Sequence, residues 1–235
     1  MLVAVDQRAR ADIVLALREK GFEPILMPPA PELAIGVSSH TDMLLFVGFG
    51  RLFCHASYYG SNKELIDRIC KEGGLELTLS SECFTDKYPS DVLFNACLLK
   101  DFVICNKKTV SSLILASAKD NGYTIIDVPQ GYTKCSVCIA SDGAILTADT
   151  AIAKACKAHN IDVLEIHEGY VSLPPYNFGF IGGASGTYGN EVYFCGNIDL
   201  HPDAKQIKEF IQKHGKTAVC LSQSQLQDVG SLFFI

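Results

Sequence analysis

The amino-acid sequence predicts an α/β fold made of five copies of one module, each a hairpin of two strands, a helix and a third strand. Three observations predict it. Apolar strand-like runs recur in pairs, each pair precedes a helical pattern and a further run, and the second strands start 50, 50, 42 and 48 residues apart. Such spacing is typical of repeat architectures. The second strands are expected at Leu2–Val5, Leu52–Ala56, Phe102–Asn106, Ala144–Asp149 and Val192–Gly196.

The second module carries the pattern most clearly. Its first strand is expected at Asp42–Phe49, and Gly50-Arg51 forms the tight turn into the second strand. Ser61-Asn62 can cap a helix, because the apolar residues that follow recur at helical spacing: Leu65, Ile66, Ile69 and Cys70. Leu75–Leu79 then alternates as the third strand.

The later modules repeat this order. Their first strands are expected at Asp91–Leu98, Ser136–Ala140 and Phe178–Gly183, the last of which a glycine-rich turn follows through Asn190. Helices are expected from about Thr109 to Asn121, over Thr150–Ala158, and from His201-Pro202-Asp203 to His214. The third strands are expected at Thr124–Val128, Asp162–Ile166 and Thr217–Leu221.

The first module lacks its first strand, because Leu2–Val5 has no partner before it. Ser231–Ile235 stands alone at the other end of the chain and is expected to pair with Leu2–Val5. This pairing closes the ring and removes an exposed edge, so residues 1–235 are expected to form a single domain. A doubly wound sheet also alternates strands and helices, but it places single strands between helices rather than hairpins.

Composition and charge exclude several classes of protein. The chain is 48% hydrophobic, which is enough to bury a sizeable core. Its net charge is −6 and no segment concentrates Lys and Arg, which argues against a nucleic-acid partner. No run of about 18 apolar residues is present, so no membrane-spanning helix is expected. The N-terminal MLVAVDQRARAD does not have the pattern of a signal peptide.

The ten cysteines are expected to be free thiols. Most lie in apolar strand or helix patterns, where cysteine behaves as a small hydrophobic residue. Without an export signal, the thiols are expected to stay reduced in the cytoplasm. Cys135 and Cys138 have the spacing of a redox motif, but a strand is expected to follow them and no second cysteine pair completes a zinc site.

The module order resembles a known architecture. Five hairpin–helix–strand modules closed by a C-terminal strand are similar to the pentein fold, the α/β propeller of arginine and agmatine deiminases, dimethylarginine hydrolases and amidinotransferases. A ribosome anti-association factor without enzymatic activity shares this fold. The resemblance covers essentially the whole chain. Five local strings further resemble a bacterial pentein-like family of unknown function: HTDMLLF, YPSDVLFNA, GYTKCSVCIASDGAILTAD, GFIGGASG and DVGSLFFI.

The resemblance also implies where a site lies. In such folds the first strand of each module lines a central channel, so its first residues form the floor of the pocket. Here those positions are Asp42, Asp91, Cys135, Gly182-Gly183 and Asp228. The resemblance implies catalytic roles for Cys135, His40 and Asp91. It implies substrate contacts for Asp42, Asn95, Lys134, Gly182, Gly183, Ser185 and Asp228, with no cofactor and no metal.

The chemistry of the resembling enzymes needs this set of side chains. A cysteine thiolate attacks the guanidinium carbon, a histidine passes protons to the departing amine, and carboxylates pair with the cationic guanidinium. Cys135 then resembles the nucleophile and His40 the acid–base group, within a string similar to the deiminase histidine motif. Lys134 is expected to lower the pKa of the adjacent thiol. In those enzymes the nucleophilic cysteine lies near the C-terminus, whereas DVGSLFFI has none.

Simpler interpretations of the same residues remain open at this point. Asp42 and Asp91 can cap turns, Cys135 can be another buried thiol, and His40 can be a loop histidine held by backbone groups. LPPYNFGF is expected to form a lid or packed loop with Tyr176 as a candidate ligand contact. The resemblance implies an enzyme acting on a small cationic guanidino or amidine compound. The alternatives are a binding protein without turnover and a protein-interaction scaffold.

Overall fold

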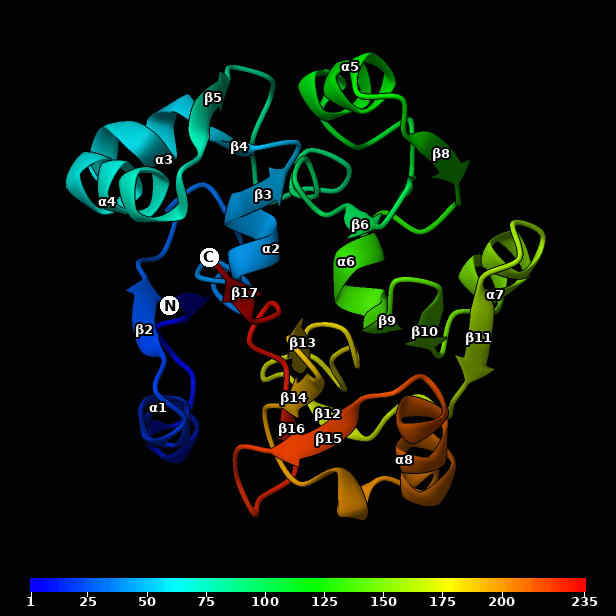
Figure 1. Ribbon diagram of the computed structural model, residues 1–235. Coiled ribbons are helices and arrows are strands. Elements are labelled where there is room, and N and C mark those ends of the chain that lie inside the picture. Colours follow the sequence, from blue (N-terminus) through cyan, green and yellow to red (C-terminus); the bar gives the residue numbers. More distant parts are fainter.

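The structure, a computed structural model, describes all residues from Met1 to Ile235. Five three-stranded sheets lie around a common centre, and the longer helices lie on the outside (Figure 1). In each sheet the inner strand pairs antiparallel with the middle strand, and the middle strand pairs parallel with the outer strand. The predicted five-module architecture is confirmed.

The modules have the following elements. Module one contains β1 (Leu2–Asp6), α1 (Ala11–Glu19) and β2 (Glu23–Met27). Module two contains β3 (Leu45–Gly48), β4 (Arg51–His55), α3 (Ala56–Ser61), α4 (Lys63–Gly73) and β5 (Glu76–Ser80). Module three contains β6 (Cys97–Leu99), β7 (Phe102–Cys105), α5 (Ser112–Asp120) and β8 (Thr124–Asp127).

Module four contains β9 (Cys138–Ser141), β10 (Ala144–Thr147), α7 (Thr150–Lys157) and β11 (Asp162–Glu165). Module five contains β13 (Ser185–Tyr188), β14 (Glu191–Phe194), the 3₁₀ helix η1 (Ile198–Leu200), α8 (Ala204–Lys213) and β15 (Thr217–Cys220). Outside the modules, β12 (Val171–Ser172) pairs parallel with β16 (Leu226–Gln227).

The two ends of the chain meet in one sheet. β17 (Phe233–Phe234) pairs antiparallel with β1, with Val3 opposite Phe234 and Ala4 opposite Phe233. This confirms the predicted pairing of the C-terminal strand with the N-terminal strand. The last strand thus supplies the inner strand that module one lacks, and it lies beside β13 near the centre (Figure 1).

The segments that lead into the inner strands differ from the prediction. Asp42–Leu44 and Ser136 were expected in strands, but they belong to the single helical turns α2 (Thr41–Leu44) and α6 (Thr133–Ser136). Phe178–Gly183 is not a strand either, and the strand of module five begins at Ser185 instead. The reason lies in the backbone hydrogen bonds, because the Gly183 N–H donates to the Cys135 carbonyl of another module rather than to a neighbouring strand.

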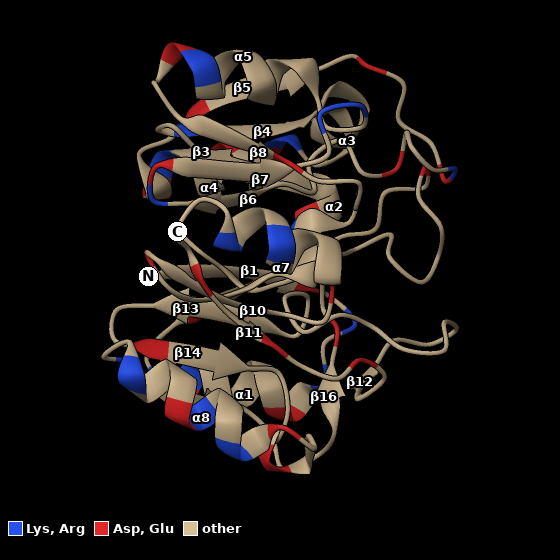
Figure 2. Cartoon of the chain, turned by 90° about the vertical axis from the view of Figure 1, so that its right-hand side faces the viewer, with Lys and Arg blue, Asp and Glu red and all other residues tan.

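The outer helices begin where side chains can cap them. The Asp149 carboxylate accepts the N–H groups of Ala151 and Ile152 at the start of α7, and the Ser111 hydroxyl accepts that of Leu113 at the start of α5. The apolar residues of these helices are buried against the sheets, whereas their charged residues, coloured in Figure 2, are mostly exposed. All ten cysteines are free, and most are buried. None of the helices is long and apolar enough to cross a membrane.

Candidate functional site

Two single helical turns bring a thiol and a carboxylate together near the centre. Asp42 lies on α2 and Cys135 on α6, and the Cys135 Sγ donates a hydrogen bond to Asp42 Oδ2 at 3.1 Å. Both residues are buried, with exposed fractions of 3% for Cys135 and 0% for Asp42. Asp42 therefore uses its side chain for contact with another module rather than to cap a turn.

Asn95 fixes the position of the thiol. Its Nδ2 donates to Cys135 Sγ at 3.0 Å, and its Oδ1 accepts the backbone N–H groups of Lys134 at 2.7 Å and Cys135 at 3.2 Å. The amide thus binds both the backbone and the side chain of α6. Asn95 is itself buried, and these contacts are all with other parts of the protein.

Ser231 links the Asp42 carboxylate to a lysine. Its Oγ lies 2.8 Å from Asp42 Oδ2 and 3.0 Å from the Gly182 carbonyl, and it accepts a hydrogen bond from Lys134 Nζ at 2.9 Å. The single hydroxyl proton can serve only one of the two acceptors at a time. Ser231 also has a φ of 68°, a left-handed conformation that is uncommon for a residue with a Cβ.

His40 lies between two further carboxylates. Its Nε2 is 3.6 Å from Asp6 Oδ2 and its Nδ1 is 3.7 Å from Asp228 Oδ1, and neither ring nitrogen has a hydrogen-bond partner. The interpretation of His40 as a histidine held by backbone groups is therefore wrong. Gly230, with a φ of 65°, packs against the His40 side chain so closely that a Cβ there would overlap it.

Burial controls the protonation of these groups. The pKa of Cys135 lies well above its usual value, because the thiol is buried and faces the charges of Asp42 and Asp228. The prediction that Lys134 lowers this pKa is wrong, since its ammonium donates to Ser231 and acts on Asp42 instead. Burial also raises the pKa of Asp42 and lowers the pKa of His40. These shifts favour the neutral forms of the buried groups.

A cavity of about 230 Å³ opens above this cluster. Three of the site residues predicted from the sequence line this cavity: His40, Cys135 and Asp228. Burial raises the pKa of Asp228 to about 6, although its carboxylate accepts the N–H groups of Phe180 and Gly230. The other walls are apolar or aromatic, formed by Val37, Met43, Tyr132, Leu173, Tyr176, Phe178 and Phe180.

Other predicted site residues lie outside this cavity. Asp91 accepts a hydrogen bond from the Tyr132 hydroxyl at 2.5 Å, so it lies behind that ring. Gly182 packs against the backbone carbonyls of α6, and Gly183 packs against the Asp228 carboxylate. The Ser185 hydroxyl donates to the Gly182 carbonyl at 3.2 Å. Gly182, Gly183 and Ser185 therefore pack around the cluster.

Sequence reasoning missed several members of the cluster. Asp6 follows the apolar run of β1 without any local motif, and it pairs with the Arg8 guanidinium. Ser231 was expected only as the first residue of the C-terminal strand, without a role in the site. His40, Asp42 and Cys135 also form a group of three potential metal ligands, with donor atoms within 4.8 Å of one another.

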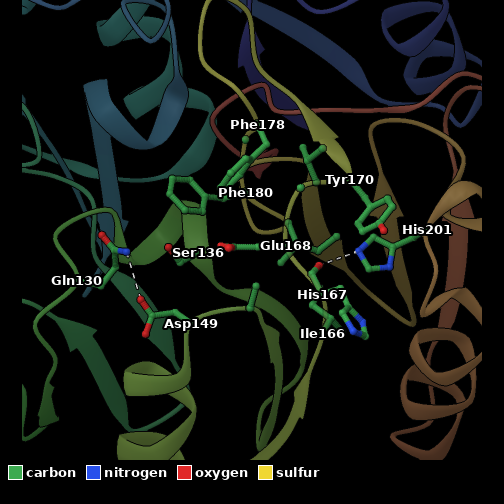
Figure 3. Close-up of a pocket in the computed structure, with 15 residues that line it drawn as sticks. Gln130, Ser136, Asp149, Ile166, His167, Glu168, Tyr170, Phe178, Phe180 and His201 are labelled. Carbon is green, nitrogen blue, oxygen red and sulfur yellow. Dashed lines mark hydrogen bonds between the residues drawn. The ribbon is translucent and has the colours of Figure 1, made fainter.

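A smaller cavity of about 90 Å³, whose lining Figure 3 shows, shares Phe178 and Phe180 with the first cavity. Gln130 donates to the Asp149 carboxylate at 3.2 Å on one side of it, and the His201 ring contacts the His167 carbonyl on the other. None of the predicted catalytic residues lines this cavity.

Comparison with known proteins agrees with this architecture. Residues 4–233 match a family described as a family of unknown function, DUF6873. No curated protein matches the chain.

Solved structures share the fold at low sequence identity. A dimethylarginine dimethylaminohydrolase (DDAH) from Pseudomonas aeruginosa, complexed with citrulline as a C249S mutant, is 9% identical, with a TM-score of 0.59 over 94% of this chain and 91% of that chain. An agmatine deiminase from C. jejuni is 9% identical, with a TM-score of 0.53 over 94% and 87%. An inosamine-phosphate amidinotransferase from Streptomyces griseus is 11% identical, with a TM-score of 0.54 over 93% and 75%. The fold is therefore the pentein fold.

Proposed function

The chain belongs to the DUF6873 family and has the pentein fold, and from this premise we propose that it is a cysteine-dependent hydrolase or transferase acting on a small guanidino or amidine compound. One observation carries the proposal: Cys135, His40 and Asp228 line the same cavity, although they come from three separate parts of the sequence. A thiol, an imidazole and a carboxylate are the groups that amidine substitution needs.

In this proposal Cys135 is the nucleophile and Asp42 is its base. The raised pKa of the thiol keeps the proton on sulfur at rest. The raised pKa of Asp42 makes its carboxylate a better acceptor than an exposed aspartate, and its Oδ2 already accepts the Sγ–H. The proton therefore passes to Asp42 as the sulfur attacks, without a preformed thiolate.

His40 supplies the proton that the leaving amine takes. Both ring nitrogens are free of other hydrogen bonds, so one can face the substrate. The charges of Asp42 and Asp6 favour the imidazolium against the effect of burial. Once it has given this proton to the leaving amine, the imidazole is neutral and can accept a proton from the attacking water.

Asp228 is the candidate partner of the guanidinium. Its pKa of about 6 leaves it ionised at neutral pH, and a planar guanidinium can donate hydrogen bonds to its two oxygens. The aromatic walls add cation–π attraction. No lysine or arginine lines the cavity, and the one basic residue, His40, already lies between the carboxylates of Asp6 and Asp228, so a carboxylate on the substrate would have no cation of its own to pair with. We therefore expect a substrate without a carboxylate group.

The proposed reaction has two stages. Sγ forms a bond to the amidine carbon, the Sγ proton moves to Asp42, and the carbon–nitrogen bond to the leaving amine breaks as that amine takes a proton from His40. Water, or an acceptor amine in a transferase, then attacks the same carbon and gives its proton to His40. The carbon–sulfur bond breaks, and the thiol regains its proton from Asp42.

The test is incubation with a panel of guanidines and amidines that differ in alkyl substitution and in the presence of a carboxylate. Release of ammonia, amine or urea is measured, and the intact protein mass is followed for a covalent adduct. Cys135→Ala should abolish release and adduct, whereas Cys138→Ala, which removes a buried thiol outside the cavity, should retain both. Full activity of the Cys135→Ala protein would remove this thiol from the mechanism.

A second candidate function is binding of the same kind of cation without turnover. The 3% exposure of Cys135 and the raised pKa of its thiol favour it, because both reduce nucleophilic reactivity. Ligand-dependent increases in melting temperature, with no product and no adduct, would support this candidate over the enzyme. Asp228→Asn should abolish the increase in either case.

A further inference from the structure

Lys134 and Cys135 are neighbours on α6, yet they serve different cavities. Cys135 lines the candidate site, whereas Lys134 lines two other cavities of about 400 Å³ and 200 Å³. Leu98 and Lys134 line both of these, so the two cavities adjoin. The larger one lies among the hairpin turns of modules three to five, which Figure 2 shows on the side opposite the long connecting loops.

The larger cavity is positively charged in a chain whose net charge is −6. Three lysines line it, Lys100, Lys134 and Lys216, against one lining carboxylate, Asp142, and Lys100 also pairs with Asp101 at 3.8 Å. Such a local excess of one sign, in a concave place, concentrates ions of the opposite sign. The cavity therefore suits an anion, although the protein as a whole repels anions.

The Lys134 ammonium has unused capacity to bind an anion. It donates one hydrogen bond, to Ser231 Oγ, and lies 5.9 Å above the centre of the Phe233 ring. It makes no ion pair, so two of its three N–H donors have no partner in the protein. The side chain is half-buried, which makes pairing with an incoming anion stronger than at a fully exposed lysine.

The smaller cavity supplies an apolar wall next to that ammonium. Apart from Lys134, its lining is entirely apolar: Phe46, Val47, Ala96, Leu98, Phe233 and Phe234. An inorganic anion would leave this wall in contact with water. A ligand with an apolar body and one charged end would cover the wall and pair with the lysine at once.

We propose that these adjoining cavities bind a small amphiphilic anion, with a carboxylate or phosphate group on the Lys134 ammonium and an apolar body against Phe46, Leu98 and Phe233. The Ser231 hydroxyl bonds to both the Lys134 ammonium and the Asp42 carboxylate, so it alone separates this site from Asp42. The ligand site is nevertheless separate from the Cys135 cavity, and its occupancy does not depend on whether that cavity performs catalysis.

The test is calorimetric titration of the whole protein with hexanoate and with phenyl phosphate. Hexanamide, phenol and inorganic phosphate are the matched probes that lack the charge or the apolar body. We expect the two amphiphilic anions to bind at least tenfold more tightly than these three probes, and the tighter of the two identifies the charged group. Equal binding of the neutral probes would overturn the electrostatic part of the proposal, and equal binding of inorganic phosphate would overturn the apolar part.

Two variants locate the binding. Lys134→Met keeps the stem of the side chain and removes its charge, and Leu98→Glu puts a negative charge at a half-buried position shared by both cavities. Each should weaken hexanoate binding at least tenfold, whereas Lys154→Met on the exposed face of α7 should leave it unchanged. A melting curve verifies that each variant is folded. Unchanged binding in either folded variant would contradict the site.

A third measurement separates this site from the Cys135 cavity. Alkylation of Cys135 by iodoacetamide is followed by peptide mass spectrometry with and without saturating hexanoate, and the exposed Cys83 serves as the internal reference. An anion bound on the Lys134 side should leave the Cys135 cavity open and should not block its alkylation. Complete protection of Cys135 by hexanoate, with no protection of Cys83, would assign the anion to the candidate site instead.

Discussion

The Cys135 thiol donates a hydrogen bond to the Asp42 carboxylate across 3.1 Å, although the two residues lie 93 positions apart in the sequence. Each residue lies on a single helical turn that leads into the inner strand of its module. The pair therefore exists only when modules two and four are assembled around the centre. It holds a proton on sulfur beside a carboxylate that can accept it, in contact with an open cavity.

Asp42→Asn should make Cys135 more reactive toward alkylation. Asp42 raises the pKa of the thiol through its charge and by accepting a hydrogen bond from Sγ, and a neutral amide removes the charge and weakens that hydrogen bond. The pH midpoint of Cys135 alkylation by iodoacetamide, followed by peptide mass spectrometry, should move to lower pH. The same variant should lose guanidine turnover, because the amide cannot take the proton from sulfur.

The matched control for this experiment is Asp120→Asn at the exposed end of α5. It makes the same chemical change far from the thiol and should leave the midpoint where it was. If Asp42→Asn also leaves the midpoint unchanged, the Asp42 carboxylate does not control the protonation of Cys135.

Gly182→Ala should prevent or strongly weaken folding. A Cβ at this position would overlap the backbone carbonyl oxygens of Lys134, Cys135 and Val137, and backbone atoms cannot move aside as a flexible side chain can. We expect a loss of about 3 kcal/mol or more in the free energy of unfolding, measured by urea denaturation. Gly60→Ala in α3 is the control, since a Cβ there meets nothing within 4 Å and should be neutral or slightly stabilising.

The module pattern could be predicted because each module repeats the same local signals. Hairpin turns, helix caps and apolar periodicity depend on neighbours in the sequence, so the five sheets and the pairing of β17 with β1 follow from it. The helical turns α2 and α6 could not be predicted, because four residues are too few to show a helical period. The first strand of module five was misplaced for a different reason: the Gly183 backbone forms hydrogen bonds with residues distant in the sequence, which local signals do not show.

The candidate site was predicted in part, for a related reason. The position before each inner strand identified Asp42, Cys135 and Asp228, which the structure brings to one cluster with His40. The protonation of the cluster was not predictable from adjacent residues. Although Lys134 adjoins Cys135 in the sequence, its ammonium donates to Ser231, which bonds to Asp42, and its charge lowers the pKa of Asp42.

Ser231→Ala and Ser231→Gly should destabilise the protein to different extents. Both remove the hydroxyl that joins Lys134 to Asp42, and we expect a loss of about 1–3 kcal/mol because buried polar groups lose a partner. Only alanine keeps a Cβ at a φ of 68°, so the glycine variant should be the more stable of the two by about 0.5–1 kcal/mol. Urea denaturation measures both values. An alanine variant as stable as the unmodified protein would show that the Ser231 hydroxyl contributes nothing to the fold.

Asp228→Asn should change how stability depends on pH. Burial raises the pKa of Asp228 from 3.8 to about 6, so between pH 4 and pH 6 the folded protein binds a proton that the unfolded chain has released. The free energy of unfolding must therefore fall as pH rises through this interval, by roughly 3 kcal/mol for this one group. An asparagine does not titrate, and it retains only one of the two carboxylate acceptors that Phe180 and Gly230 use. The variant should accordingly be less stable than the unmodified protein at pH 4, and the difference should shrink or reverse by pH 7.

The measurement is urea denaturation of both proteins at intervals of half a pH unit from 4 to 7. The difference between the two curves reports Asp228 together with its effect on neighbouring groups such as Asp42, whose pKa the Asp228 charge raises. A difference that stays constant across the interval would mean that the buried carboxylate titrates at its ordinary pKa.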